Sequence, residues 1–209
     1  MTTTTTAVKT QGATLLAHTQ QATAVVTIGS AVDVSTAWSA RVFFRMGRSV
    51  TNALTNELKF RLEASAKSSG NDCWYPMAEW NSLFGKTACV APTVNDASFN
   101  AADTTFVVSS GTSIVAGSIL YVRETGTPAN SEWMRVASIS GTTVTLEEGV
   151  TRNHTNGVTV TTYGEMFSFD VDLSGVGRLR LVVDSASAAS GQTVDVLAWI
   201  TTLDSALGT

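Results

Sequence analysis

Residues 164–173 read GEMFSFDVDL, residues 175–184 read GVGRLRLVVD and residues 193–202 read TVDVLAWITT, and these three runs decide the fold. Each run alternates between polar and apolar residues and is bounded by Gly, Ser or Asp, which is typical of consecutive antiparallel β-strands. Three strands cannot bury their own apolar face, because a sheet needs a second layer to cover it. The runs therefore predict a β-sandwich whose second sheet comes from earlier in the chain.

The last of these runs presents two different faces. Its even-numbered residues from 194 to 200 are all apolar and form the expected core face. The opposite face carries Leu197 and Trp199, which are too large and too apolar for a surface that is fully exposed to water. We therefore expect a neighbouring part of the protein to cover the outer side of this strand.

The composition indicates a folded all-β protein. The chain has 209 residues, of which 44% are hydrophobic and 14% charged, enough for one large domain or two smaller ones. A net charge of -4 argues against a nucleic-acid partner, since such proteins usually carry a basic surface. No apolar run is long enough to span a bilayer, and the N-terminus lacks the features of a signal peptide. We expect neither a membrane partner nor export.

Residues 1–21 form a polar segment that opens with five consecutive threonines, Thr2, Thr3, Thr4, Thr5 and Thr6. The segment has few large apolar side chains, so burial offsets little of the entropy lost on ordering it. We predict an N-terminal arm that a neighbouring copy or a different subunit holds in place, which makes the five threonines candidate partner-binding residues. An arm folded along its own domain is the alternative.

Three further segments have strand patterns: residues 23–28 (TAVVTI), 40–47 (ARVFFRMG) and 57–66 (ELKFRLEASA). The third segment could also form a helix, because Glu, Leu, Lys and Ala favour one. Helical spacing would scatter its apolar residues around the cylinder, whereas a strand places them on one face. The alternation therefore favours a strand.

Residues 73–84 read CWYPMAEWNSLF and are the densest aromatic segment. Pro76 excludes the segment from the middle of a sheet and permits a short helix from Pro76 to about residue 83. We take Trp74, Tyr75 and Trp80 as candidate partner-binding residues, either as an anchor into a partner or as a platform that stacks on sugars. A plug of the core beneath a long loop is the simpler interpretation of the same residues.

From about residue 94 the strands become short, with turn signals at even spacing. This pattern predicts a small β-barrel at residues 95–163. Because the barrel interrupts the longer alternating strands, we expect it to be inserted into a sandwich formed by residues 22–94 and 164–209. The predicted fold is all-β, an antiparallel sandwich with an inserted small β-barrel.

Four short segments, with Arg152 and His154 before Gly157, carry a family resemblance: ADTTFVV (102–108), GSILYV (117–122), EWMRV (132–136) and SGTTVTL (140–146). Through them, residues 101–162 resemble a small β module that recurs in virion proteins of tailed bacteriophages. In its usual form the module has Gly before the acidic residue, whereas this chain has Ala102 before Asp103. The flanking halves resemble the jelly-roll sandwiches of phage capsid decoration (cement) proteins. This resemblance implies an all-β fold, a jelly-roll-like antiparallel sandwich with an inserted small β-barrel.

The inventory of chemically active residues is small. The 2 histidines, His18 and His154, lie far apart in sequence, and we find no nucleophile elbow, phosphate loop or zinc spacing. Asp170 and Asp172 share a strand face, but a Ca²⁺ site needs more oxygen ligands than these two carboxylates provide. We therefore predict no catalytic residue, no cofactor and no metal site.

The two cysteines, Cys73 and Cys89, could bridge a loop. Without an export signal they are better interpreted as two thiols.

Together these features lead us to expect a protein that is not an enzyme. The resemblance implies a decoration protein that bridges subunits of the major capsid protein, assembles as a homo-oligomer (a dimer or a trimer), and is located in the virion after assembly in the bacterial cytoplasm. The alternatives are a tail or baseplate protein and a carbohydrate-binding module that uses Trp74, Tyr75, Trp80 or Trp133.

Overall fold

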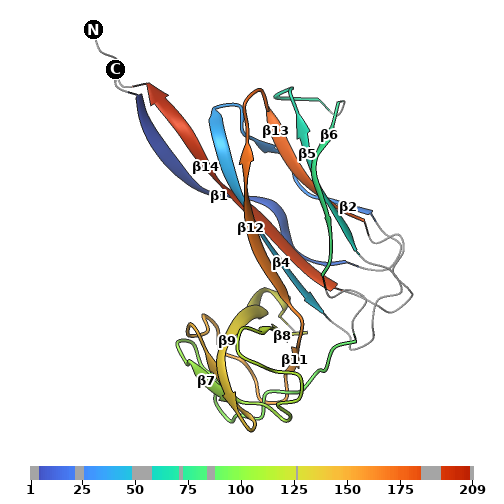
Figure 1. Cartoon of the computed structure of the whole chain (residues 1–209), viewed down its shortest axis with the longest axis vertical. Helices are drawn as coiled ribbons and strands as arrows, with labels where there is room; N and C mark the ends of the chain where they lie inside the picture. Colours follow the sequence, from blue (N-terminus) through green and yellow to red (C-terminus); the bar gives the residue numbers. More distant parts are fainter. Residues whose placement is uncertain are drawn as a thin grey trace.

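The structure is a computed structural model that describes residues 5–21, 26–48, 58–70, 73–83, 88–125, 127–184 and 194–207. These residues form strands joined by loops, with one 3-10 turn at Pro128–Asn130 (Figure 1). The strands are β1 (Thr5–Gln21), β2 (Val26–Ile28), β3 (Val32–Asp33), β4 (Ala37–Arg48), β5 (Lys59–Ser65), β6 (Tyr75–Asn81), β7 (Thr105–Val107), β8 (Ile119–Arg123), β9 (Glu132–Ser140), β10 (Thr143–Leu146), β11 (Thr159–Thr161), β12 (Glu165–Asp172), β13 (Arg178–Asp184) and β14 (Val194–Leu207).

Two antiparallel sheets make up the sandwich. One has the order β1-β14-β4-β12, and the other has the order β2-β13-β5-β6, with β3 paired to β13. If β3 is set aside and the sandwich strands are numbered 1 to 8 along the chain, these orders are 1-8-3-6 and 2-7-4-5. This is the topology of a jelly roll, as the resemblance of the flanking halves implies.

The three alternating runs that open the sequence analysis are strands β12, β13 and β14, but they do not pair with one another. β12 and β14 lie on either side of β4, whereas β13 lies in the opposite sheet between β2 and β5. Alternation reveals that a run is a strand with one buried face, and it carries no information about which strand lies next to it. The chain crosses between the sheets at each of these connections.

The sandwich core consists of side chains from the inner faces of both sheets. Even-numbered residues of β14 from Val194 to Ile200 are buried, as the alternation predicts. On β5, Phe60 and Leu62 are buried, which confirms a strand there in place of a helix. The Phe44 ring lies 4.5 Å from the ring of Phe60 and ties the two sheets together.

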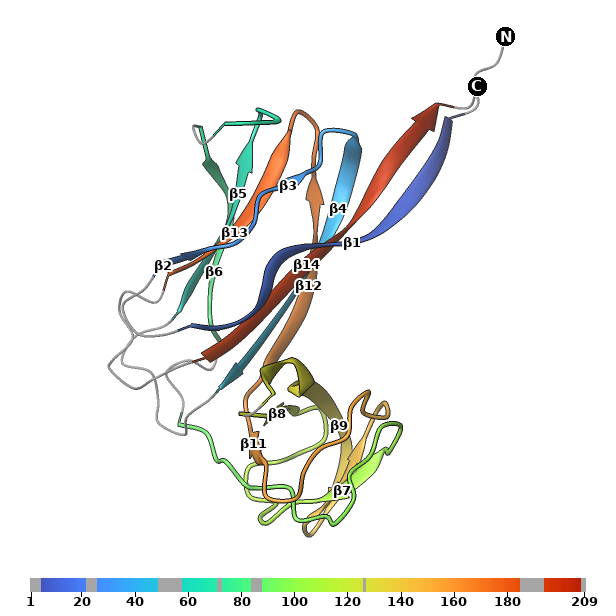
Figure 2. The same cartoon turned by 180° about the vertical axis from the view of Figure 1, so that it is seen from behind.

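The predicted N-terminal arm is different in the structure. Over Thr5–Gln21 it is β1, an edge strand of the protein's own sheet, and its Leu15 and Leu16 are buried in the core. Figure 2 shows β1 curving from β14 toward β2, where a Cβ on Gly29 would overlap the carbonyl oxygen of Leu15. Pairing with β14 and the burial of these two leucines together hold the strand on its own domain.

The five threonines of the predicted arm are only partly covered by the structure. Thr5 pairs with Leu207 and Thr6 pairs with Ala206, at the end of the β1–β14 ribbon. Thr2, Thr3 and Thr4 lie outside the described residues.

The aromatic segment is a strand and not a helix. Residues Tyr75–Asn81 form β6, which pairs with β5 and lies at the edge of its sheet. Pro76 is tolerated there because an edge strand has one side without ladder hydrogen bonds, and the pairing has a register shift beside it. The expectation that Pro76 avoids a central strand therefore agrees with the structure, whereas the expected short helix from Pro76 is wrong.

Residues 88–163 form a second β unit, which we call the module, between β6 and β12. Its sheet has the order β11-β8-β9-β10-β7, and it encloses its own core, which includes Phe99, Phe106 and Leu120. The prediction of a barrel is wrong in one respect, because the sheet is open between β7 and β11. Bridges from Thr93 to Thr159 and from Val94 to Val108 span that opening without forming a strand of their own. Short strands with regularly spaced turns occur both in closed barrels and in open sheets, so the sequence pattern does not distinguish the two.

Two smaller expectations can be compared with the fold. Cys73 is exposed, Cys89 is buried, and no disulfide joins them. Burial raises the pKa of the Cys89 thiol. Within the described residues, no helix is long and apolar enough to cross a membrane.

Ala102 generates a prediction about stability. Its φ of 75° lies in the left-handed region, where an L side chain is strained and Gly is not, and Gly is what the resembled module has at this position. We expect Ala102→Gly to raise the free energy of unfolding by about 0.5–1 kcal/mol, since the relief of strain exceeds the added entropy of the unfolded chain. Urea denaturation measures the change. A loss of stability would contradict it.

Candidate functional site

The predicted aromatic residues do not form one site. Trp80 points into the sandwich core, where its ring lies 5.7 Å from those of Phe60 and Phe167. Trp74 lies under two guanidinium groups, with the nearer one, Arg180, 4.2 Å from the ring centroid. Tyr75 alone is mostly exposed, at 64%. Trp80 thus matches the interpretation as a core plug, and the three residues form no shared platform.

His154 has partners that the sequence did not reveal. It is buried in the module, with Nδ1 3.3 Å from the Glu124 carboxylate and Nε2 3.8 Å from the Glu132 carboxylate. Glu132 also accepts hydrogen bonds from the backbone N–H and the hydroxyl of Thr151, at 3.0 and 2.9 Å. These contacts tie β9 to the loops before β11, so the histidine supports the module structurally.

The aspartates considered for Ca²⁺ are already engaged. Asp170 accepts two hydrogen bonds from the guanidinium of Arg41, at 2.8 and 2.7 Å, and these bonds lower its pKa. Asp172 accepts from the backbone and hydroxyl of Ser174. Among the described residues, no group of three or more His, Cys, Asp or Glu side chains could hold a metal ion.

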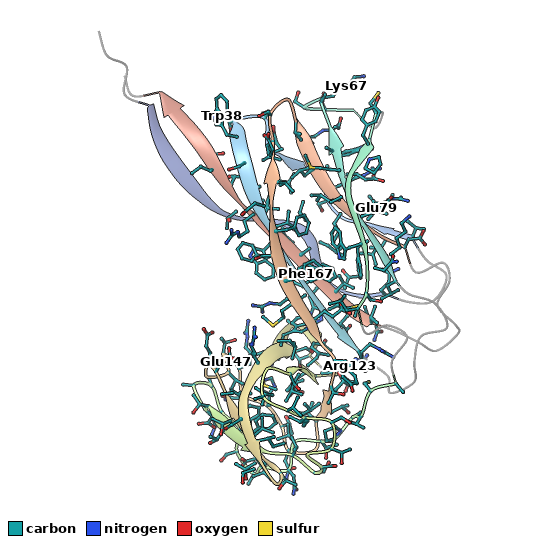
Figure 3. The ribbon with its side chains drawn as sticks, viewed as in Figure 1. Trp38, Lys67, Glu79, Arg123, Glu147 and Phe167 are labelled. Atoms are coloured by element: carbon teal, nitrogen blue, oxygen red, sulfur yellow. The ribbon has the colours of Figure 1, made fainter. Side chains whose placement is uncertain are left out.

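The polar groups that the fold does bring together lie where the module meets the sandwich, which we call the joint (Figure 3, near Arg123). Asp195 on β14 is only 4% exposed, and it accepts a hydrogen bond of 2.9 Å from the Tyr121 hydroxyl on β8. Arg123 Nε donates to the same carboxylate at 3.3 Å. His18 Nε2 on β1 lies 3.1 Å from the Tyr121 oxygen. The joint therefore connects three strands that are far apart in sequence.

Contacts that involve the backbone also pack the module closely against the sandwich. A Cβ on Gly47 would overlap the ring of Tyr121, so the ring packs directly on the backbone of β4. The Thr161 hydroxyl donates to the carbonyl of Arg48 at 2.8 Å, and the Gly164 N–H donates to the carbonyl of Ile119 at 2.9 Å. The two parts are thus packed against each other at several points, beyond the chain connections alone.

The joint combines a carboxylate, an imidazole and a hydroxyl, a set that nucleophilic enzymes also use. In those enzymes a base removes the proton from the attacking hydroxyl. Here burial, together with the Asp195 charge, raises the pKa of Tyr121, so its hydroxyl keeps the proton and donates a hydrogen bond to the carboxylate. The arrangement favours a structural role for Tyr121, as the donor that satisfies a buried charge.

A cleft of about 530 Å³ lies beside the joint, between the outer face of the β1-β14-β4-β12 sheet and the module. Leu197 and Met166 line its sandwich side, and Trp133 and Glu147 line its module side. The module therefore covers part of the outer face of β14, as Leu197 predicts. Trp199 is covered differently, because Phe43 stacks on its ring at 5.3 Å and Arg45 lies over it at 5.0 Å.

No protein-family model and no curated protein matches the sequence. Among solved structures, the chain is similar in part to the Gp54 tailspike of Acinetobacter baumannii bacteriophage AP22, solved in complex with A. baumannii capsular saccharide. The two share 18% sequence identity with a TM-score of 0.31, and the match covers 36% of this chain and 14% of the tailspike. A similarity at this level carries no argument about function.

The close approach at Gly47 can be tested by a double-mutant cycle. We expect Gly47→Ala to lower the free energy of unfolding by about 1–3 kcal/mol, because the new methyl group displaces the Tyr121 ring. In a Tyr121→Ala background the same change should cost much less, since the overlapping ring is gone. Equal costs in the two backgrounds, measured by urea denaturation, would rule out the contact.

The raised pKa of Tyr121 predicts how stability depends on pH. The unfolded chain loses the phenolic proton near the ordinary tyrosine pKa of 10.0, whereas the folded chain retains the proton to higher pH. The contribution of the protonated Tyr121 hydroxyl to the free energy of unfolding is therefore complete below pH 10. Above pH 10 this contribution falls by about 1.4 kcal/mol per pH unit. We expect Tyr121→Phe to be less stable than the wild type at pH 8 and the difference to shrink above pH 10. A difference in the free energy of unfolding between the two proteins that stays constant from pH 8 to above pH 10 would contradict this.

Proposed function

We propose that this protein is a structural component of a tailed-bacteriophage virion, and specifically a decoration protein that stabilises the head by bridging capsid subunits. One observation carries the proposal. The residues that resemble the virion module, 101–162, fall within a compact unit inserted between two strands of a jelly roll, and that unit has its own core. Ala102, which replaces the usual Gly, has the backbone conformation that such a Gly adopts.

The joint suggests how such a protein would work. A protein that resists the separation of capsid subunits must transmit force without deforming, which a flexible link between its two parts would prevent. The buried Tyr121–Asp195 hydrogen bond and the close packing at Gly47 fix the module relative to the sandwich. Small interfaces repeated over many identical copies then add up, since about 800 Å² per partner is enough for a stable contact.

The shape of the molecule indicates which end would meet the capsid. The module lies at one end of the sandwich, and the β1–β14 ribbon, which carries the first and last described residues, points away from it (Figure 1). We infer that the ribbon end contacts the major capsid protein and that the module projects outward. The edge of β1 also offers backbone groups for pairing with a second copy, in line with a dimer or trimer.

The alternative of a carbohydrate-binding module built on Trp74, Tyr75, Trp80 and Trp133 has little support. Trp80 is part of the sandwich core, and Trp133 is buried beside Tyr121. The rings of these residues lie in separate environments and offer no continuous surface for a sugar chain.

Deleting residues 2–10 tests the proposed capsid contact. The deletion removes the first six residues of β1, Thr5 to Thr10, and keeps Leu15 and Leu16, which the core needs. We expect the truncated protein to fold, as judged by circular dichroism, and its occupancy on phage heads to fall at least tenfold, since tenfold corresponds to about 1.4 kcal/mol of lost binding energy. Mass spectrometry of purified heads gives the occupancy.

Undiminished occupancy would remove the ribbon from the mechanism. Recovery of the full-length protein with isolated tails, and not with heads, would contradict decoration of the capsid and favour the tail or baseplate alternative.

A further inference from the structure

A second groove lies at the end of the sandwich opposite the module, where Trp38 is labelled in Figure 3. Its volume is about 510 Å³. The loop before β4 contributes Ser35 and Thr36, and the turn between β12 and β13 contributes Ser174 and Gly175. The proposed function makes no use of this groove.

Trp38 differs from the other tryptophans of the chain. Its side chain is 62% exposed. The other four each pack against a ring or a guanidinium group, whereas neither kind of contact is found for Trp38 within the part of the chain that the structure describes. An indole with open faces beside a groove can stack on the apolar C–H face of a sugar ring.

The groove also offers oriented polar groups on two sides. Ser174 donates hydrogen bonds to Asp172 Oδ1 from its backbone N–H at 2.9 Å and from its hydroxyl at 2.7 Å. The backbone N–H of Ser35 donates to Asp33 Oδ1 at 2.9 Å. Ser35 and Ser174 themselves line the groove, and their hydroxyl oxygens can accept hydrogen bonds from ligand hydroxyls.

The charge of the groove narrows the class of ligand. Its lining contains no Lys, Arg or His, and the serines on its two sides are each bonded to a carboxylate. An anionic sugar would find no cation in this lining to compensate for its charge. A protein partner usually requires an extended apolar patch, whereas here the large apolar surface is a single ring.

We propose that the groove binds a neutral saccharide, with one sugar ring stacked on Trp38 and its hydroxyls bonded to the polar groups at Ser35 and Ser174. The inference does not depend on the proposed role in the capsid, because it concerns binding by the isolated protein.

Binding is tested with a glycan array that carries neutral and anionic bacterial oligosaccharides, followed by calorimetry of the full-length protein with the best neutral and the best anionic probe. We expect a neutral oligosaccharide to bind, and Trp38→Ala to weaken that binding at least tenfold, which corresponds to about 1.4 kcal/mol. Trp38→Phe should retain most of the affinity, because it keeps a ring on which to stack. Tyr75→Ala, which removes an equally exposed aromatic from β6, should leave the affinity unchanged.

Three outcomes would overturn the proposal: no neutral probe binds, the anionic probe binds more tightly, or Trp38→Ala binds as the wild type does. A loss of head occupancy in Trp38→Ala, without any affinity for a saccharide, would instead assign this end of the molecule to a protein partner. Because the saccharide measurement needs no virion, its failure is distinguishable from failure of the proposed capsid role.

Discussion

The hydrogen bond between Tyr121 and Asp195 is the interaction on which the arrangement of this protein depends. Asp195 is a buried residue on the outer face of β14, and a buried carboxylate is unfavourable unless donors surround it. The donors come from β8 of the module, through Tyr121 and Arg123. The module therefore buries a carboxylate on the outer face of β14 and also supplies the donors that compensate for its burial.

Shape complementarity adds to this electrostatic requirement. The Tyr121 ring can reach Asp195 because Gly47 leaves no side chain in its way. Glycine at this position weakens β4 as a strand, since it packs nothing and gains backbone entropy when unfolded. The packing of the Tyr121 ring on Gly47 offsets this loss of strand stability, because it lets the module contact the sandwich directly. An inserted unit with its own core is in this way made part of one rigid molecule.

How much could be predicted from the sequence differs between the parts of the fold. The alternation of residues 164–202 and 57–66 revealed strands and their buried faces, because a period of two follows directly from strand geometry. It could not reveal that β13 lies opposite β12 and β14, since pairing depends on contacts distant in sequence. Leu15 and Leu16 were too few to outweigh the polar composition around them, yet they anchor β1 in the core.

The candidate site was harder to predict than the fold. Asp195 occupies a polar position in an alternating strand, where an exposed residue is the normal expectation, and only the module makes it buried. Trp38 precedes the alternating core of β4 and has no aromatic neighbour in sequence, so no local pattern marks it as a binding residue. The dense aromatic cluster at residues 73–84 does have such a pattern. Its exposure at the end of the sandwich could be seen only once the strands were placed.

The central claim is that module and sandwich move as one body, and ¹⁵N relaxation of backbone amides measures this directly. A rigid joint predicts the same rotational correlation time for amides in β8–β10 and for amides in β4, β13 and β14. A shorter correlation time for the module would mean that it moves independently, and the account of the joint would then be wrong.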